Sequence, residues 1–133
     1  MYDRILVPTD GRESTERAID EAIGLASEHD ATLHTLYVVN SASIAPGIDF
    51  EDLEEVGRQA VDYVSNRATA AGIEHVEGDV THSLRHRSII AYADERDIDL
   101  IVIGRHRELD HFVRGSVSKR VFEEASVPVL LVE

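Results

Sequence analysis

Basic side chains and glycines gather near the end of this sequence, in a chain that is otherwise acidic. Residues 104–120 carry a local net charge of +3, whereas the chain as a whole has a net charge of −13. The basic residues of this segment are Arg105, Arg107, Arg114, Lys119 and Arg120. Glycine lets a backbone approach a ligand closely, and arginine hydrogen-bonds to phosphate through a planar fork of donors. The segment therefore predicts a site for an anion.

The elements on either side of this segment indicate how an anion would be held. Residues 98–104 read as a buried strand that ends at Gly104, and a helix is expected from about Gly115 to Ala125. Ligands of open α/β sheets bind beyond the carboxyl ends of the strands, and a helix N-terminus offers unpaired N–H groups. We expect the N–H groups of Gly115 and Ser116 to bind phosphate, assisted by the hydroxyls of Ser116 and Ser118. The alternative is an ordinary Gly-Ser helix start.

The whole chain alternates between short apolar runs and stretches of helical periodicity. Strands are expected at residues 3–8, 31–39, 74–80, 98–104 and 128–132, and helices at about 14–28, 51–71, 88–96 and 115–125. Short connections favour right-handed crossovers and one parallel sheet covered on both faces. The predicted fold class is α/β, a doubly wound five-stranded parallel sheet sandwiched by four helices, in a single domain over residues 1–133. The third strand, which is weakly apolar, is expected at an edge.

Apolar spacing also predicts which helix faces are buried. The second helix should turn inward a stripe of Leu53, Val56, Ala60, Val64 and Ala68, and the last helix Val117, Val121 and Phe122. Gly72 is a natural stop for the second helix. The loop before that helix is expected to run from Asn40 to Phe50.

Composition limits the classes of function. The chain has no cysteine, which excludes disulfides, thiolate metal sites and thiol nucleophiles. Its 26 acidic against 13 basic residues would repel nucleic acid, so no nucleic-acid partner is expected. The same excess indicates either a merely acidic soluble protein or a halophilic one adapted to a salt-rich cytoplasm. No apolar run approaches the length of a membrane span, so we expect a cytoplasmic protein without membrane contact.

Histidines and known catalytic motifs give no support for a metal or an enzyme. His82 and His86 lie four residues apart and His106 and His111 five apart, but both pairs are expected in loops and neither has a recognised ligand spacing. His29, His34 and His75 are expected to be surface or half-buried neutral residues. The chain lacks the Gly-x-Ser-x-Gly motif of serine hydrolases, the Walker phosphate-binding motif and the dinucleotide-binding motif Gly-x-Gly-x-x-Gly. We therefore expect no catalytic residues and no resident metal.

The loops that leave the carboxyl ends of the first four strands should meet at one rim of the sheet. They lie near residues 9–13, 40–49, 81–87 and 104–114. Asp10, after the first strand, could accept hydrogen bonds from a ribose or a base. The alternative is that an aspartate in Thr-Asp-Gly serves only as a turn or helix-capping residue.

Several segments taken together resemble the universal stress protein family. They are residues 5–11 (Ile-Leu-Val-Pro-Thr-Asp-Gly), 36–39, 97–106, 115–117 and 127–132, and they cover essentially the whole chain in matching order. The resemblance implies a fold like that of the adenine nucleotide alpha hydrolases and a homodimer joined through the strand Pro128 to Val132. In one branch of the family it also implies a bound ATP.

The ATP-binding branch carries the signature Gly-x-x-Gly, nine residues, and Gly-Ser or Gly-Thr. This chain supplies Gly104 and the pair Gly115-Ser116, but Arg107 replaces the second glycine and seven residues, 108–114, precede Gly115. The resemblance implies nucleotide contacts at Pro8, Asp10, Val38, Ile103, Gly104, His106, Gly115, Ser116 and Val117. The predicted site also includes Thr9, Arg107, Arg114 and Ser118.

Two interpretations of the altered signature remain open. In the first, Arg105, Arg107 and Arg114 replace the lost backbone contacts with charge-assisted hydrogen bonds to phosphate, and the protein binds ATP, with Mg²⁺, or a related adenine nucleotide. In the second, the arginines fill the pocket by pairing with Asp10 or Glu108, and the protein is a dimeric interaction module without nucleotide. ATP hydrolysis would need a base and a metal-binding carboxylate near the γ-phosphate, so a non-enzymatic stress-response protein is predicted.

Overall fold

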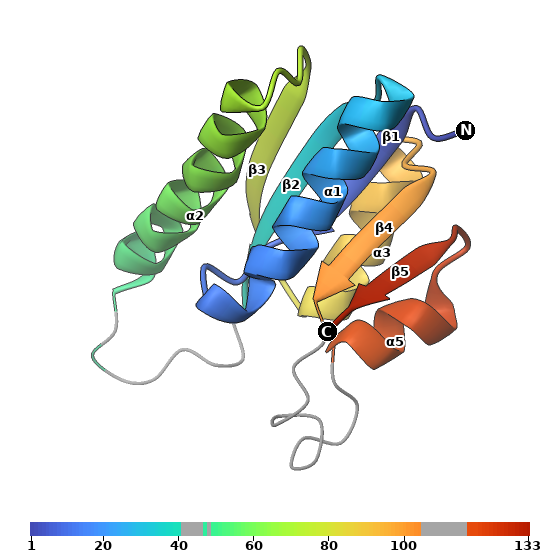
Figure 1. The fold of residues 1–133 in the computed structure, drawn as a ribbon. Helices are drawn as coiled ribbons and strands as arrows, with labels where there is room; N and C mark the ends of the chain where they lie inside the picture. Colours follow the sequence, from blue (N-terminus) through green and yellow to red (C-terminus); the bar gives the residue numbers. More distant parts are fainter. Residues whose placement is uncertain (41–46, 48, 105–116) are drawn as a thin grey trace.

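The computed structural model describes residues 1–40, 47, 49–104 and 117–133. All five predicted strands are present: β1 (Arg4–Pro8), β2 (Thr32–Val39), β3 (Val76–His82), β4 (Leu100–Gly104) and β5 (Val129–Val132). The helices are α1 (Glu16–His29), α2 (Phe50–Ala70), α3 (Arg85–Glu95) and α5 (Val117–Glu124), with a 3-10 helix at Glu13–Thr15. The sheet is parallel with the strand order β3-β2-β1-β4-β5 (Figure 1). The predicted α/β sandwich is therefore confirmed.

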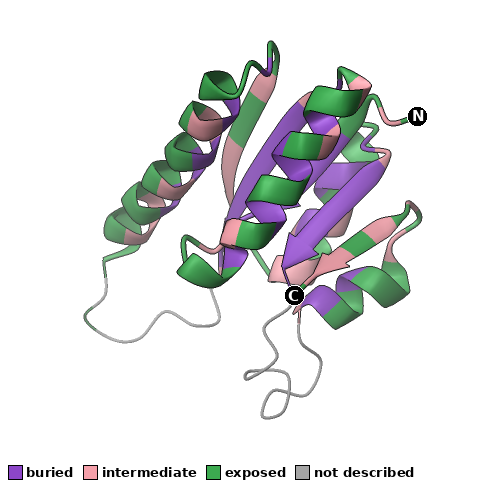
Figure 2. Cartoon of the chain, viewed as in Figure 1, coloured by how far each residue is buried: buried purple, intermediate pink, exposed green. Residues whose placement is uncertain are grey.

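Two layers of helices cover the sheet, because successive side chains of a strand point to opposite faces. On one face, Ile5 and Leu33 pack with side chains of α1 and α2 such as Ala22 and Val64. On the other, strand residues including Leu6 and Leu36 pack with Ile89 of α3 and Val121 of α5. The buried residues of the sheet lie on the three central strands, and β3 and β5 form its edges (Figure 2). The expectation that β3 is an edge strand is confirmed.

The ends of the helices follow local sequence signals. The carboxylate of Asp49 accepts the N–H of Glu51 at 3.0 Å and so caps the start of α2. Helix α2 therefore begins at Phe50, which had been expected in the preceding loop. Just beyond the end of α2, Gly72 has φ +92°, a conformation that favours glycine and confirms the predicted stop. No helix in the described ranges is long and apolar enough to cross a membrane.

Two side chains predicted to face the core are exposed. The buried face of α2 runs through Gly57, Val61, Val64 and Ala68, and Val56, one position before Gly57, is 50 % exposed. On α5 the fully buried residue is Val121, whereas Phe122 is 57 % exposed. Each misplaced residue is adjacent in sequence to a buried one, which rotates it about 100° around the helix.

The connection between β3 and α3 is shorter than predicted. Strand β3 extends to His82 and α3 begins at Arg85, although residues 81–87 had been expected as a turn and the helix from Ser88. Arg85, His86 and Arg87 occupy the first turn of α3. Basic residues at that end oppose the helix dipole, so their charges give no signal for a helix start at Arg85.

The strand order fixes the location of a ligand crevice. After β1 the chain moves to β2 and β3 on one side, and then returns to β4 and β5 on the other side. Doubly wound sheets bind ligands at the carboxyl ends of the two strands where the order reverses. In this chain those strands are β1 and β4.

Candidate functional site

The turn that leaves β1 is held by a compact set of hydrogen bonds. The N–H of Thr9 donates to the carbonyl of Leu36 on β2 at 2.9 Å, and the Thr9 hydroxyl oxygen accepts the N–H of Gly11 at 3.1 Å. Gly11 has φ +75°, a left-handed conformation that favours glycine. Thr9 itself is buried. Pro8, Thr9 and Asp10 therefore occupy fixed positions at the carboxyl end of β1.

Asp10 takes part in this turn. Its Oδ1 accepts the N–H of Arg12 at 2.9 Å, so the carboxylate closes an Asx turn. The predicted role of Asp10 as a turn residue is confirmed, whereas a contact between Asp10 and a ligand stays a prediction. The turn holds the half-buried carboxylate at the rim.

The end of β4 lies against the 3-10 helix (Glu13–Thr15) that precedes α1. A Cβ built on Gly104 would lie 3.5 Å from the carbonyl oxygen of Ser14 and 3.7 Å from the Cα of Thr15. Gly104 is buried, as is its neighbour Ile103. The structure therefore brings the end of β4 to the segment that follows the Thr9–Gly11 turn.

The apolar residues of the predicted site lie on the face of the sheet that α3 and α5 cover. Val38 and Ile103 are each 5 % exposed and belong to one core cluster, and Val117, the first residue of α5, packs against that cluster. The next residue, Ser118, is also buried. The predictions for His106, Arg107, Arg114, Gly115 and Ser116 concern positions outside the described residues.

A cavity of about 450 Å³ lies beside the β1 turn, between α1 and α2. Thr9, Gly11 and Arg12 line it from the turn, and Gln59 and Tyr63 line it from α2. Of the predicted site residues that the structure describes, Thr9 alone lines this cavity. The cavity therefore adjoins the predicted site and does not coincide with it.

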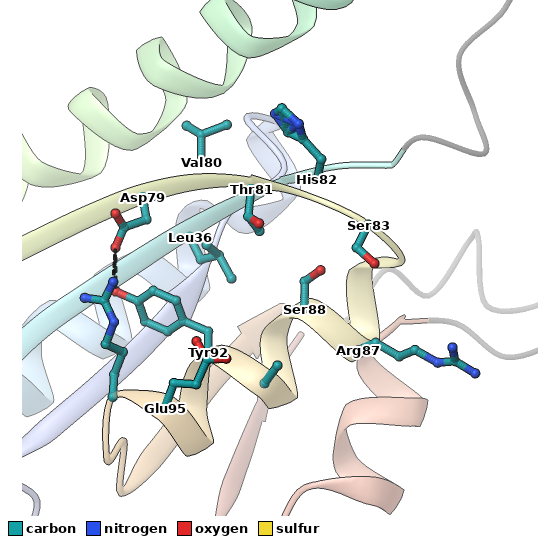
Figure 3. Close-up of a pocket in the computed structure, with 12 residues that line it drawn as sticks. Leu36, Asp79, Val80, Thr81, His82, Ser83, Arg87, Ser88, Tyr92 and Glu95 are labelled. Atoms are coloured by element: carbon teal, nitrogen blue, oxygen red, sulfur yellow. Dashed lines mark hydrogen bonds and ion pairs between the residues drawn. The ribbon is translucent and has the colours of Figure 1, made fainter.

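A second cavity, of about 470 Å³, lies between β3 and α3 (Figure 3). Its lining includes Leu36, Asp79, Thr81, Ser88 and Tyr92. Sequence analysis did not predict this groove. The alternation of Asp79 and Thr81 along β3 and the one-turn spacing of Ser88 and Tyr92 on α3 are the signals that point to it.

The histidines differ from expectation in two ways. His34, expected at or near the surface, is 1 % exposed because the strand that carries it is covered on both faces. His82 and His86 lie in β3 and α3 rather than in loops, with Nε2 of His82 2.8 Å from Glu54 and Nε2 of His86 3.7 Å from Glu124. Within the described ranges, no three His, Asp or Glu side chains are arranged to hold a metal ion.

Comparison with known proteins relates the chain to one family over its full length. The model of the universal stress protein family matches residues 1–133. Universal stress protein MJ0531 of Methanocaldococcus jannaschii is 30 % identical over 143 residues, which cover 100 % of this chain and 83 % of the relative.

Solved structures of universal stress proteins have a similar fold. The universal stress protein UspA of Lactobacillus plantarum is 30 % identical, with a TM-score of 0.82 over 99 % of this chain and 98 % of that chain. A universal stress protein crystallised in complex with cAMP is 24 % identical, with a TM-score of 0.80 over 99 % of this chain and 97 % of that chain. Its identity to this chain supports a shared fold. Family, fold and order of elements therefore coincide, and the chain belongs to the universal stress protein family.

Proposed function

We propose that this chain binds an adenine nucleotide at the carboxyl ends of β1 and β4 and acts as a nucleotide-responsive stress protein. The observation that carries the proposal is that the end of β4 lies against the 3-10 helix that follows the β1 turn, at the place where the strand order reverses. Doubly wound sheets bind ligands at that place. The stress protein of similar fold that is in complex with cAMP supports an adenine nucleotide as the class of ligand.

The described residues suit the nucleoside part of such a ligand. Val38 and Ile103 are buried near the end of the sheet and would form the apolar floor beneath a purine. Asp10 supplies a carboxylate that accepts hydrogen bonds from ribose hydroxyls, and the Asx turn fixes its direction. Pro8 and Thr9 set the position of that turn, because the Thr9 N–H is bonded to β2.

The phosphates would lie toward the segment between β4 and α5. We assign their binding to Arg107, Arg114 and the N–H groups of Gly115 and Ser116, with His106 and Ser118 nearby. Charge-assisted hydrogen bonds from arginine compensate for the glycine that Arg107 replaces. A triphosphate accompanied by Mg²⁺ is the nucleotide that uses most of these groups, so ATP is the proposed ligand.

We propose binding without catalysis. Hydrolysis of ATP needs a positioned base and a carboxylate that holds the metal near the γ-phosphate. At the β1 turn the carboxylate nearest to the proposed site is that of Asp10, and its Oδ1 already accepts a hydrogen bond from the N–H of Arg12. Steady release of phosphate that disappears in an Asp10→Ala variant would overturn this part of the proposal.

The proposed working form is a homodimer joined through the outer edge of β5. In the described part of the sheet no strand pairs with that edge. Leu130 on β5 is 38 % exposed, and Phe122 on the adjacent helix α5 is 57 % exposed. A second copy would extend the sheet and cover both side chains. Light scattering in molar KCl tests this assembly, and a monomeric mass would exclude it.

Calorimetric titration with Mg-ATP in molar KCl tests nucleotide binding, since molar salt screens nonspecific phosphate contacts. We expect saturable, micromolar binding at one site per chain, and binding about tenfold weaker in Arg107→Ala, a loss of roughly 1.4 kcal/mol. Arg87→Ala is the matched control, because Arg87 lies exposed on α3 and outside the proposed site. This variant should bind as the parent does.

Two results would contradict the proposal. No heat from folded protein that carries no copurified nucleotide would favour the alternative, in which the arginines close the site and the chain is an interaction module. Unchanged or tighter binding by Arg107→Ala would exclude the assigned role of that arginine.

A further inference from the structure

Five polar side chains meet where β3 lies beside β2 and α3 packs on the sheet, away from the proposed nucleotide site. Nδ1 of His34 lies 3.1 Å from the hydroxyl oxygen of Tyr92 and 3.2 Å from Oε2 of Glu77. The Tyr92 hydroxyl donates to Oδ2 of Asp79 at 3.0 Å. Arg96 completes the group, with guanidinium nitrogens 3.6 Å from Asp79 and 3.8 Å from Glu77. Figure 3 shows Tyr92 reaching from α3 toward Asp79 on β3.

The hydrogen bonds define the state of the His34 ring. A tyrosine hydroxyl has one proton, and that of Tyr92 is donated to Asp79, so its oxygen accepts from His34. The Glu77 carboxylate is also an acceptor, which places the imidazole proton on Nδ1. Nε2 then carries a lone pair, and this atom is buried with no hydrogen-bond partner in the described structure. The contacts therefore select a neutral imidazole.

We infer that His34, Glu77, Asp79, Tyr92 and Arg96 form a clasp that holds β3 and α3 to the sheet at neutral pH and releases them in mild acid. A second proton on the closed ring would sit on Nε2, as a buried N–H without an acceptor. When the edge opens, the ring reaches water and takes that proton without this cost. Acid therefore favours the open edge.

The charges around the ring act in both directions. Burial is the largest effect and lowers the pKa of the His34 imidazole, as do the nearby charges of Arg4 on β1 and Arg96 on α3. The carboxylates of Glu77 and Asp79 on β3 raise this pKa. The net result is a pKa below the ordinary value. A cavity of about 370 Å³ next to the ring is lined by Arg4, His34 and Glu77, and also by Glu74 and His75 from the segment before β3. Glu74 and His75 are therefore two further titratable groups close to the clasp.

The sign of the pH effect follows from this lowered pKa. In the open edge the imidazole has its ordinary pKa of about 6.5, so above that pH both forms are neutral and opening is independent of pH. Below it the open form holds one more proton than the closed form. The opening equilibrium then approaches a tenfold increase per pH unit, until the closed ring itself is protonated. Strand β3 responds first because in the described sheet its outer side has no pairing strand.

Hydrogen–deuterium exchange of the full chain, corrected for intrinsic exchange rates, tests the clasp between pH 7.5 and 5.5. We expect opening of β3 and α3 to rise about tenfold from pH 7.5 to 5.5, most of it below pH 6.5, while β1, β4 and α1 change little. His34→Gln keeps a side-chain N–H donor and cannot titrate, so its opening should not vary with pH over this range. The matched control His75→Gln removes an exposed histidine at the same edge and should keep the parental response.

Three results would overturn the inference: opening of β3 that does not change with pH, an unchanged response in His34→Gln, or an equal response in all elements. Nitrogen-15 NMR of the imidazole rings gives a second test that needs no variant. We expect His34 to be the neutral Nδ1–H form at pH 7 and to gain its proton below pH 6.5. A His34 ring that titrates at or above pH 6.5 would exclude the clasp.

Discussion

The carboxylate of Asp99 holds the backbone of Asp3, although 96 residues separate them in the sequence. Oδ2 of Asp99 accepts the N–H of Asp3 at 2.8 Å, and Oδ1 accepts the N–H of Arg4 at 3.2 Å. The backbone N–H of Asp99 in turn donates to the carbonyl of Arg4 at 3.0 Å. These bonds align the starts of β1 and β4, the two strands whose other ends form the proposed site.

Removing this carboxylate should weaken the alignment of the two strands. We expect Asp99→Ala to lower the free energy of unfolding by about 1–3 kcal/mol, because two N–H groups lose a charged acceptor. Asp99→Asn retains one acceptor oxygen and should lose less. Urea unfolding of the three proteins measures the difference, and equal stability of Asp99→Ala and the parent would show that solvent replaces both bonds.

Two glycines give opposite predictions for the same substitution. A Cβ on Gly78 of β3 would clash with Cγ1 of Val61, which is 6 % exposed on α2. Gly78→Ala should therefore destabilise the protein by about 1–3 kcal/mol through overpacking. Nothing lies within 4 Å of a Cβ on Gly24, in α1, so Gly24→Ala should stabilise by up to about 1 kcal/mol. Thermal unfolding checks both, and a shift of the same sign in both variants would contradict the packing argument.

Alkaline pH should destabilise the protein through Tyr92. Burial and the neighbouring Asp79 raise the pKa of this phenol above its ordinary value of about 10. Above pH 10 the unfolded chain loses the proton while the folded protein keeps it, so stability falls by up to about 1.4 kcal/mol per pH unit. A hydrogen bond with Glu16 raises the pKa of Tyr63 as well, and this contribution is common to the parent and the variant.

Tyr92→Phe isolates the contribution of Tyr92. Urea unfolding between pH 8 and 11 should show a shallower loss of stability in the variant than in the parent. At pH 8 the variant should be less stable by about 1–2 kcal/mol, because Asp79 loses the hydroxyl donor. Identical slopes in the two proteins would exclude the proposed protonation difference.

Salt should affect the whole protein and one ion pair in opposite directions. Arg67 on α2 pairs with Glu16 at 2.5 Å and also with Asp20, both on α1. Arg67→Met keeps the apolar stem and should cost about 0.5–1 kcal/mol at low salt and less in molar KCl. The parent, with its net charge of −13, should gain thermal stability as KCl screens self-repulsion. A deficit of Arg67→Met that grows with salt would contradict this assignment.

The sequence predicted the order and type of every strand because the strand signals are local. Val7 and Ile101 lie in short apolar runs, and turn residues such as Gly72 end the elements between them. The predicted buried faces of the helices were wrong where either of two neighbouring residues could face the core. Val56 and Phe122 each adjoin a residue that is buried, and apolar spacing alone does not decide which of two neighbouring positions on a helix faces the core.

Long-range pairings explain what the sequence could not give. Nothing near His34 in the sequence indicates that Tyr92 and Glu77 will meet its ring, because those partners come from another helix and another strand. Similarly, the turn function of Asp10 follows from its own neighbours, whereas its position beside β4 depends on the sheet order. The predictions for residues 105–116 lie outside what the structure describes.

The central place of β1 also constrains how the chain is made. This strand is synthesised before the others, yet its two neighbours in the sheet are β2 and β4, and β4 begins only at Leu100. On the ribosome, one edge of β1 therefore has no partner strand until about 95 further residues have emerged, and Leu6 lacks the residues of α3 and α5 that bury it in the folded protein. Nascent chains of this length should depend on chaperones, with cooperative folding delayed until the second half of the sheet is available.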